Sequence, residues 1–146
     1  MVDGYNGEVY IDHIGIACNN LEDSSNFWRL MGLAESEEDE VVESQGVKIR
    51  FFSTSASSAD VNPPRFELLE SLGVDTPIGK FLSKKGQGVQ QVCLRVEDLN
   101  SVIRYLKDNG IQVINDAPMQ GSDNSLIAFV HPKSTGGVLI ELTQTL

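Results

Sequence analysis

The chain has 146 residues, a hydrophobic content of 40% and a formal charge of −10 at pH 7. This composition predicts a single globular domain, and no stretch approaches the roughly 20 apolar residues that a membrane-spanning helix needs. The acidic balance excludes general binding to nucleic acids or to anionic membranes. Its two cysteines, Cys18 and Cys93, lie in apolar runs without a disulfide framework, and the N-terminal sequence is unlike a secretory signal. These features predict a cytoplasmic protein.

The predicted elements occur twice along the chain in the same order. Apolar and β-branched residues predict strands over 9–18 and 88–96, and each is followed by an amphipathic helix, over 21–31 and 98–109. The acidic run at 35–40 is expected to be a solvated loop. Further strands are predicted over 41–44, 47–53, 65–70, 112–115, 125–130 and 137–143.

Between the two halves, the segment TPIGKFLSKKGQG predicts a short helix. Thr76 is a suitable N-cap, Pro77 suits the first helical position, and Gly86 ends the turn. Three apolar side chains are expected to hold this helix to the core: Ile78, Phe81 and Leu82.

The second half of the chain repeats the first. With His13 set against Gln91, HIGIACNNLEDSSNFWRLMGL lies over QVCLRVEDLNSVIRYLKDNGI without a gap, and RFELLE lies farther along over LIELTQ. The repeat predicts a βαβββ module over 8–71, a linker with a short helix over 72–86 and a second βαβββ module over 87–146. We therefore expect an α+β fold in one domain, with a curved eight-stranded mixed sheet around a central cleft.

Four polar residues occupy matching positions of the repeat: His13 and Gln91 on the first strands, Glu67 and Glu141 on the last. Because strand side chains alternate faces, each is predicted to point away from its apolar neighbours. An imidazole, two carboxylates and an amide oxygen form a mixed N/O site that suits a divalent transition metal. The four residues are therefore the predicted metal ligands. For the histidine, a hydrogen-bonded structural role is the alternative.

Several blocks between about Ile11 and Gln144 match a known family. They are IDHIGIA, QGV at 45–47, FELLE, TPIGKFL and IAFVHPKSTGGVLIEL. On these blocks the chain resembles the methylmalonyl-CoA epimerases of the vicinal oxygen chelate (glyoxalase) superfamily. The resemblance implies paired βαβββ modules around a divalent metal ion (Co, Zn, Ni or Mn) and a homodimer.

The resemblance also implies roles for individual residues. The family's metal-site residues match His13, Glu67 and Glu141, and its closing glutamate also serves in proton transfer. The family's second-half ligand is a histidine from a His-His pair, which aligns with Gln90 and Gln91, so both positions are glutamine here. Some members carry a glutamate base just after QGV, where this chain has KIRFF.

The implied activity is the interconversion of (R)- and (S)-methylmalonyl-CoA by deprotonation and reprotonation at C2 through a metal-stabilised enolate. Glu141 is the candidate base, and Glu67 is the symmetric candidate for the opposite face. Lys133, in the HPKS turn, is the candidate contact for the phosphates of the acyl-CoA, while His131 in the same turn is expected to be structural. Two alternatives stay open: another enzyme of the superfamily, such as a glyoxalase I-like lyase or a dioxygenase, and a metal-free small-molecule binding protein.

Overall fold

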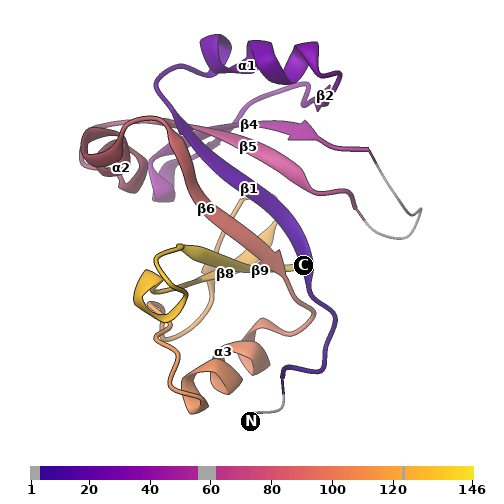
Figure 1. The fold of residues 1–146 in the computed structure, drawn as a ribbon, viewed down its shortest axis with the longest axis vertical. Helices are drawn as coiled ribbons and strands as arrows, with labels where there is room; N and C mark the ends of the chain where they lie inside the picture. The colour runs from indigo at the N-terminus through magenta and orange to yellow at the C-terminus, as the bar shows by residue number, and fades with distance from the viewer. Residues whose placement is uncertain (1–3, 56–61, 123) are drawn as a thin grey trace. The chain divides into compact units, whose positions relative to one another are not determined.

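The computed structural model describes residues 4–55, 62–122 and 124–146, which contain nine β-strands, three α-helices and two short 3₁₀ turns (Figure 1). The chain divides into two compact units. The N-terminal unit is Asp12–Gln90, and the C-terminal unit is Gln91–Leu146 together with Met1–Ile11. Among the described helices, none has the length and apolar character required to cross a membrane.

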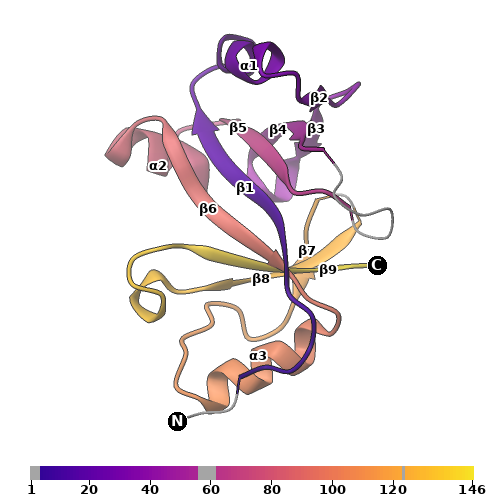
Figure 2. The same cartoon turned by 45° about the vertical axis from the view of Figure 1, so that its right-hand side comes forward.

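The N-terminal unit is built on a mixed sheet that follows the β-α-β-β-β order with one extra short strand (Figure 2). β1 runs parallel to β5, β5 runs antiparallel to β4, and both short strands pair with β4. In this register Gly15 and Phe51 both lie opposite Glu67. The strands are β1 (Tyr10–Cys18), which belongs to this unit from Asp12 onward, β2 (Ala34–Glu35), β3 (Glu40–Val42), β4 (Val47–Ser53) and β5 (Arg65–Ser71).

Apolar residues cover both faces of this sheet. Successive strand residues point to opposite sides, and both sets of residues include buried apolar side chains. Helix α1 (Leu21–Leu30), capped by the Asn20 side chain on the backbone N–H of Asp23, packs on one face. The buried residues there are Cys18, Leu21, Phe52 and Leu68. The other face buries Ala17, Val47, Ile49, Phe51, Leu69 and Ile78. By the same alternation, His13 and Glu67 belong to this second face.

Helix α2 (Pro77–Lys85) confirms the helix predicted between the halves. Thr76 caps it by accepting a hydrogen bond from the Gly79 N–H, and the Gly86 N–H closes it on the Leu82 carbonyl. Its buried Ile78, together with the partly buried Phe81 and Leu82, packs against the second apolar face of the N-terminal unit.

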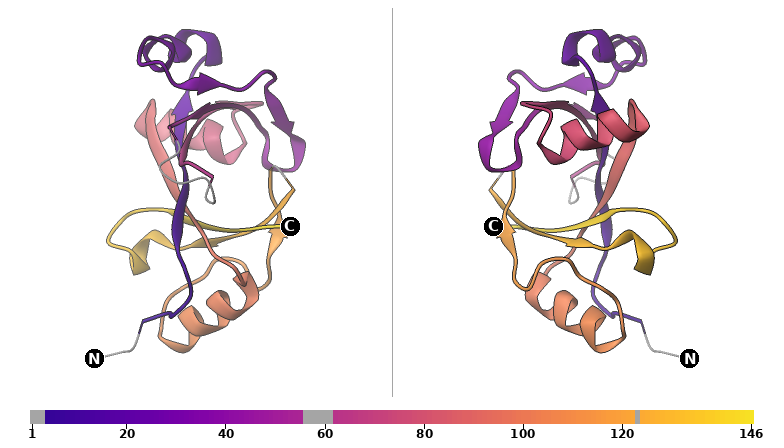
Figure 3. Two further views of the ribbon diagram at one scale, coloured as in Figure 1. Left: turned by 90° about the vertical axis from the view of Figure 1, so that its right-hand side faces the viewer. Right: turned by 90° about the vertical axis from the view of Figure 1, so that its left-hand side faces the viewer.

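The C-terminal unit has the same arrangement of strands, in the order β6-β9-β8-β7. β6 runs parallel to β9, with Cys93 opposite Glu141, and β8 and β9 run antiparallel side by side in every view (Figure 3). Its strands are β6 (Gly88–Arg95), β7 (Met119–Gln120), β8 (Ser125–Val130) and β9 (Ile140–Thr145). Helix α3 (Leu99–Asp108), capped by Asp98, buries Leu99, Val102 and Ile103 in the core of this unit.

The predicted α+β fold is confirmed, and the differences are local. The strand expected over 112–115 is reduced to a single bridge between Val113 and Val130. The strand expected from 137 begins only at Ile140, because Gly136 and Gly137 adopt positive φ angles of 74° and 103° in the preceding turn. The two-residue strands β2 and β7 were not predicted, since two residues carry no periodicity.

Replacing Phe52 with alanine is expected to cost about 3–5 kcal/mol of unfolding free energy, because the side chain is fully buried and leaves a cavity. Urea denaturation of the wild-type and variant proteins measures this loss. Phe27→Ala is the matched control, because Phe27 is 59% exposed and its loss should cost far less. Equal losses for the two variants would contradict the assignment of this core.

Candidate active site

The N-terminal unit brings two of the predicted site residues into contact. His13 is 4% exposed and Glu67 is 2% exposed. The Nδ1 atom of His13 lies 3.0 Å from Oε2 of Glu67. The register explains the contact, because Glu67 lies opposite Gly15 on the neighbouring strand, two residues beyond His13 on the same face. Gly15 has no side chain to stand between them.

Two further charged residues belong to this pair, and the sequence reasoning missed both. Asp12 Oδ2 lies 2.8 Å from His13 Nδ1. The Arg65 Nη2 atom lies 3.8 Å from Glu67 Oε2 and 3.9 Å from Asp12 Oδ2, and its guanidinium carbon stands 4.4 Å from the centre of the Phe51 ring. A cation therefore stands beside both carboxylates. The sequence does contain a signal for Arg65. It lies two residues before Glu67, so strand alternation places both side chains on the same face.

The C-terminal unit repeats the arrangement with the other two predicted residues. Gln91 and Glu141 are also buried, and the Gln91 Nε2 donates a hydrogen bond of 3.1 Å to Glu141 Oε1. Glu141 lies opposite Cys93, again two residues beyond its partner on the parallel first strand. Each unit thus joins a first-strand side chain to a last-strand glutamate at the same diagonal of a parallel strand pair.

The chemistry of these donors fits a divalent transition metal. Each pair combines a carboxylate with either an imidazole or an amide, and the polar atoms within the pairs are 3.0 and 3.1 Å apart. Each pair therefore places the imidazole or the amide directly beside the carboxylate of the same unit. Imidazole nitrogen and carboxylate or amide oxygen suit zinc, cobalt, nickel and manganese.

The turn that carries His131 and Lys133 has a different role. His131 caps the 3₁₀ turn Pro132–Ser134 by accepting the backbone N–H of Lys133 at Nδ1, over 3.1 Å. The predicted structural role of His131 is therefore confirmed. Lys133 is exposed in this turn, and its contact with a phosphate stays a prediction.

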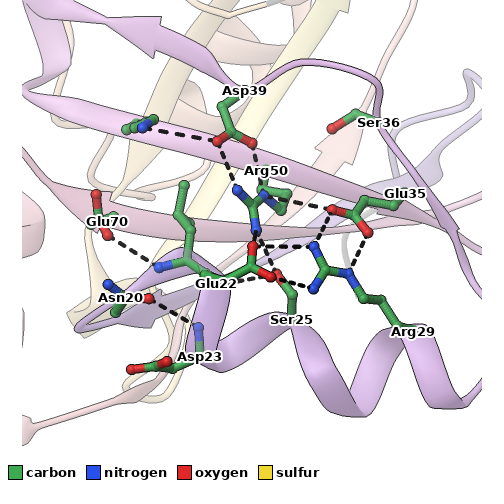
Figure 4. Close-up of polar contacts among 12 residues, drawn as sticks. Asn20, Glu22, Asp23, Ser25, Arg29, Glu35, Ser36, Asp39, Arg50 and Glu70 are labelled. Atoms are coloured by element: carbon green, nitrogen blue, oxygen red, sulfur yellow. Dashed lines mark hydrogen bonds and ion pairs between the residues drawn. The ribbon is translucent and has the colours of Figure 1, made fainter.

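The opposite face of the N-terminal sheet carries a network of ion pairs between α1 and β4 (Figure 4). Arg50 donates to both carboxylate oxygens of Asp39 at 2.8 and 2.9 Å and to Glu22 at 2.9 Å. Arg29 donates to Glu22 and Glu35. The acidic run at 35–40 is therefore only partly the solvated loop that was predicted, since Asp39 and Glu35 are held by arginines.

The Arg50 hydrogen bonds lower the pKa of Asp39 below its ordinary value. A carboxyl with a lower pKa in the folded state stabilises the protein above its unfolded pKa of about 3.9, and that contribution is lost as the pH falls through the folded value. The unfolding free energy of the wild type should therefore fall on acidification below about pH 4. Arg50→Met should be less stable at pH 7 and should lose less on acidification.

Urea denaturation across this pH range measures both slopes. Lys107→Met is the matched control, because the Asp116 partner of Lys107 is fully exposed. Parallel stability profiles for wild type and Arg50→Met would contradict a role for the Asp39 contact.

Comparison with known proteins shows the family to which the chain belongs. Residues 12–129 match the model of the glyoxalase/bleomycin resistance protein/dioxygenase superfamily. The mitochondrial methylmalonyl-CoA epimerase of Mus musculus is 33% identical over 92% of this chain and 72% of its own. A variant of the Streptomyces coelicolor methylmalonyl-CoA epimerase, in complex with 2-nitronate-propionyl-CoA, is 36% identical with a TM-score of 0.85, over 92% of this chain and 96% of its own.

A methylmalonyl-CoA epimerase in complex with methylmalonyl-CoA and NH4+ is equally similar, at 36% identity and a TM-score of 0.85 over 92% of this chain and 93% of its own. The family match covers most of the chain, and identities above 30% extend over nearly the whole length. The chain therefore belongs to the glyoxalase/bleomycin resistance protein/dioxygenase superfamily and, within it, to the family of the methylmalonyl-CoA epimerases.

Proposed function

We propose that this protein is a metal-dependent epimerase that interconverts (R)- and (S)-methylmalonyl-CoA. The observation that carries the proposal is the repeated contact of a buried first-strand side chain with a buried last-strand glutamate, His13 with Glu67 and Gln91 with Glu141. Two carboxylates at equivalent positions of a repeat suit a reaction that moves a proton on two faces of one carbon. The relatives named for this reaction support the same assignment.

The proposed ligands of a divalent ion are His13, Glu67, Gln91 and Glu141. Their assignment to one site comes from the sequence repeat, which gives the four residues equivalent positions. When bound, the ion supplies Lewis-acid stabilisation of the negative charge that develops on the thioester oxygen. In the structure the Gln91 Nε2 donates a hydrogen bond to Glu141. Rotating the amide group by 180° exchanges Nε2 and Oε1, and Oε1 is the atom that would bind the ion.

Proton transfer is assigned to the two glutamates. Glu141 removes the proton from C2, and the electron pair of the broken C–H bond passes into the enolate of the thioester. A proton returned to the opposite face of the planar carbon gives the other epimer, and Glu67 is the proposed donor. The forward reaction leaves Glu141 protonated and Glu67 ionised, which is the starting state for the reverse reaction. Proton exchange with solvent restores the state for another forward turnover.

Binding of the acyl-CoA phosphates is assigned to Lys133. Lys133→Ala is expected to raise KM for methylmalonyl-CoA by about two- to fivefold at low salt, the effect of an exposed ion pair worth about 0.5–1 kcal/mol. Steady-state kinetics at two ionic strengths measures the change, which should shrink in high salt. Lys107→Ala is the control, and an unchanged KM for Lys133→Ala at low salt would contradict the assignment.

We also propose that the protein is a homodimer in the cytoplasm. Sedimentation measures the oligomeric state, and cell fractionation measures the location.

A metal-free binding protein is the second candidate function, favoured by glutamine at both Gln90 and Gln91 in place of the family's histidines. Metal analysis of the untagged protein separates this candidate from the enzyme.

The decisive test of the proposed function is deuterium uptake at C2 of methylmalonyl-CoA in D₂O. A two-residue epimerase incorporates solvent deuterium because the hydrogen delivered to C2 comes from the second glutamate, whose acidic hydrogen exchanges with D₂O. Uptake that requires a divalent ion supports the proposal. A metal-loaded protein that catalyses no exchange would leave a different reaction of the superfamily, and a protein that binds no metal and catalyses none would leave the binding protein.

A further inference from the structure

We propose that Asp12 is a positioning residue for His13: it accepts the Nδ1–H of the imidazole and thereby presents the other ring nitrogen, Nε2, to a divalent ion. The inference deepens the proposed function and rests on it for the ion. Its basis is the 2.8 Å contact between Asp12 Oδ2 and His13 Nδ1 within β1. The Asp12 side chain is 15% exposed, so little water competes for this contact.

The surroundings of His13 Nδ1 determine where the ring carries its proton. Oxygens of two carboxylates, Asp12 and Glu67, lie 2.8 and 3.0 Å from this nitrogen. An ionised Asp12 carboxylate is an acceptor only, so a nitrogen lone pair in this place would face its negative oxygen at 2.8 Å. In the neutral imidazole the proton is therefore on Nδ1, and Nε2 has the lone pair that a metal ion requires.

Asp12 and Glu67 have different tasks in this arrangement. Glu67 is a proposed ligand of the ion. A Glu67 oxygen that accepts a hydrogen bond from His13 Nδ1–H is not available to bind the ion. Asp12 holds the same hydrogen and leaves the Glu67 carboxylate to the ion. The Arg65 guanidinium, 3.8–3.9 Å from both carboxylates, offsets part of the negative charge that this division gathers.

The second histidine of the chain provides an internal contrast. The sequence contains two histidines. His131 Nδ1 accepts the backbone N–H of Lys133, so its proton must lie on Nε2. The two imidazoles are therefore expected to be opposite tautomers in the same metal-free protein.

The first test is long-range ¹H–¹⁵N correlation of the imidazoles in the ¹⁵N-labelled, metal-free protein, recorded where both rings are neutral. We expect the Nδ1–H pattern for His13 and the Nε2–H pattern for His131. Glu67→Gln removes the second carboxylate and should leave His13 as Nδ1–H. Adding Asp12→Ala to Glu67→Gln should abolish this preference. An Nε2–H pattern for His13 in the wild type, or a preference that survives in the double variant, would overturn the proposal.

The second test is titration with Co²⁺ against a competing chelator. Asp12→Ala should weaken Co²⁺ binding by about 10–100-fold, the usual cost of removing a partner of a ligating histidine, and Asp12→Asn should fall between. Asp116→Ala removes the same charge at a fully exposed position and should leave the affinity unchanged. An unchanged affinity for Asp12→Ala overturns the proposal. If the wild type binds no Co²⁺, the metal-dependent function fails, whereas the tautomer measurement still decides whether Asp12 positions His13.

Discussion

Glu141→Gln is expected to lower the rate of epimerisation by about 10²–10⁴-fold, the usual contribution of a placed general base. The amide has nearly the size of the carboxylate, and its oxygen can still accept the hydrogen bond from Gln91 Nε2. The fold should therefore persist while the capacity to remove a proton is lost. The measurement is the steady-state rate of conversion of each epimer, with the cation content of the variant determined in parallel.

Deuterium exchange with solvent shows whether the Glu141→Gln variant has lost a catalytic base or a metal ligand. If Glu141 and Glu67 act on opposite faces, Glu141→Gln should abolish deuterium uptake from one epimer and retain uptake from the other. Glu67→Gln, the matched variant at the equivalent position of the repeat, should show the reverse preference. Loss of uptake from both epimers together with the bound ion would assign Glu141 to the metal alone. A rate within about threefold of the wild type would exclude it as the base.

The elements that position the candidate site could be predicted because each has a strong local signal. The α2 helix has a threonine cap, a proline at its first position and a glycine at its end, and all three act as expected. The repeat then aligned the first and last strands of each half. It predicted which side chains share a face, and the contacts of His13 with Glu67 and of Gln91 with Glu141 lie on those faces.

The charged neighbours of His13 could not be predicted in the same way. Strand alternation assigns Asp12 to the face opposite His13, yet its short side chain reaches the Nδ1 of the adjacent imidazole. Strand alternation places Arg65 on the same face as Glu67. Its position directly opposite His13, however, depends on the register between β1 and β5. Register between strands separated by about fifty residues is a tertiary property that no local pattern in this sequence encodes.

The ion-pair network of α1 and β4 shows a similar limit. Composition alone favoured a solvated loop for the acidic run, and Glu37 and Glu38 are indeed exposed. Asp39 differs because the antiparallel hairpin places it beside Arg50, which lies eleven residues later in the chain. Glu35 and Asp39 are held because the fold places Arg29 and Arg50 beside them.

Replacing Gln91 with histidine is expected to tighten binding of Co²⁺ or Zn²⁺ by at least about tenfold, or about 1.4 kcal/mol. A neutral amide oxygen is a weaker ligand for these ions than an imidazole nitrogen. Gln91 already lies buried at the position of the repeat that is equivalent to His13, and its Nε2 contacts Glu141 over 3.1 Å. The imidazole would therefore enter the proposed ligand set at a position where the family carries histidine.

The neighbouring glutamine supplies the control for this substitution. Gln90→His introduces the same side chain one residue earlier, where strand alternation directs it to the other face of β6. Chelator competition should show tighter binding for Gln91→His and unchanged binding for Gln90→His. A gain in both variants would indicate adventitious binding by an added histidine. No gain in Gln91→His would exclude Gln91 from the ligand set, because an improved donor at a ligating position must change the affinity.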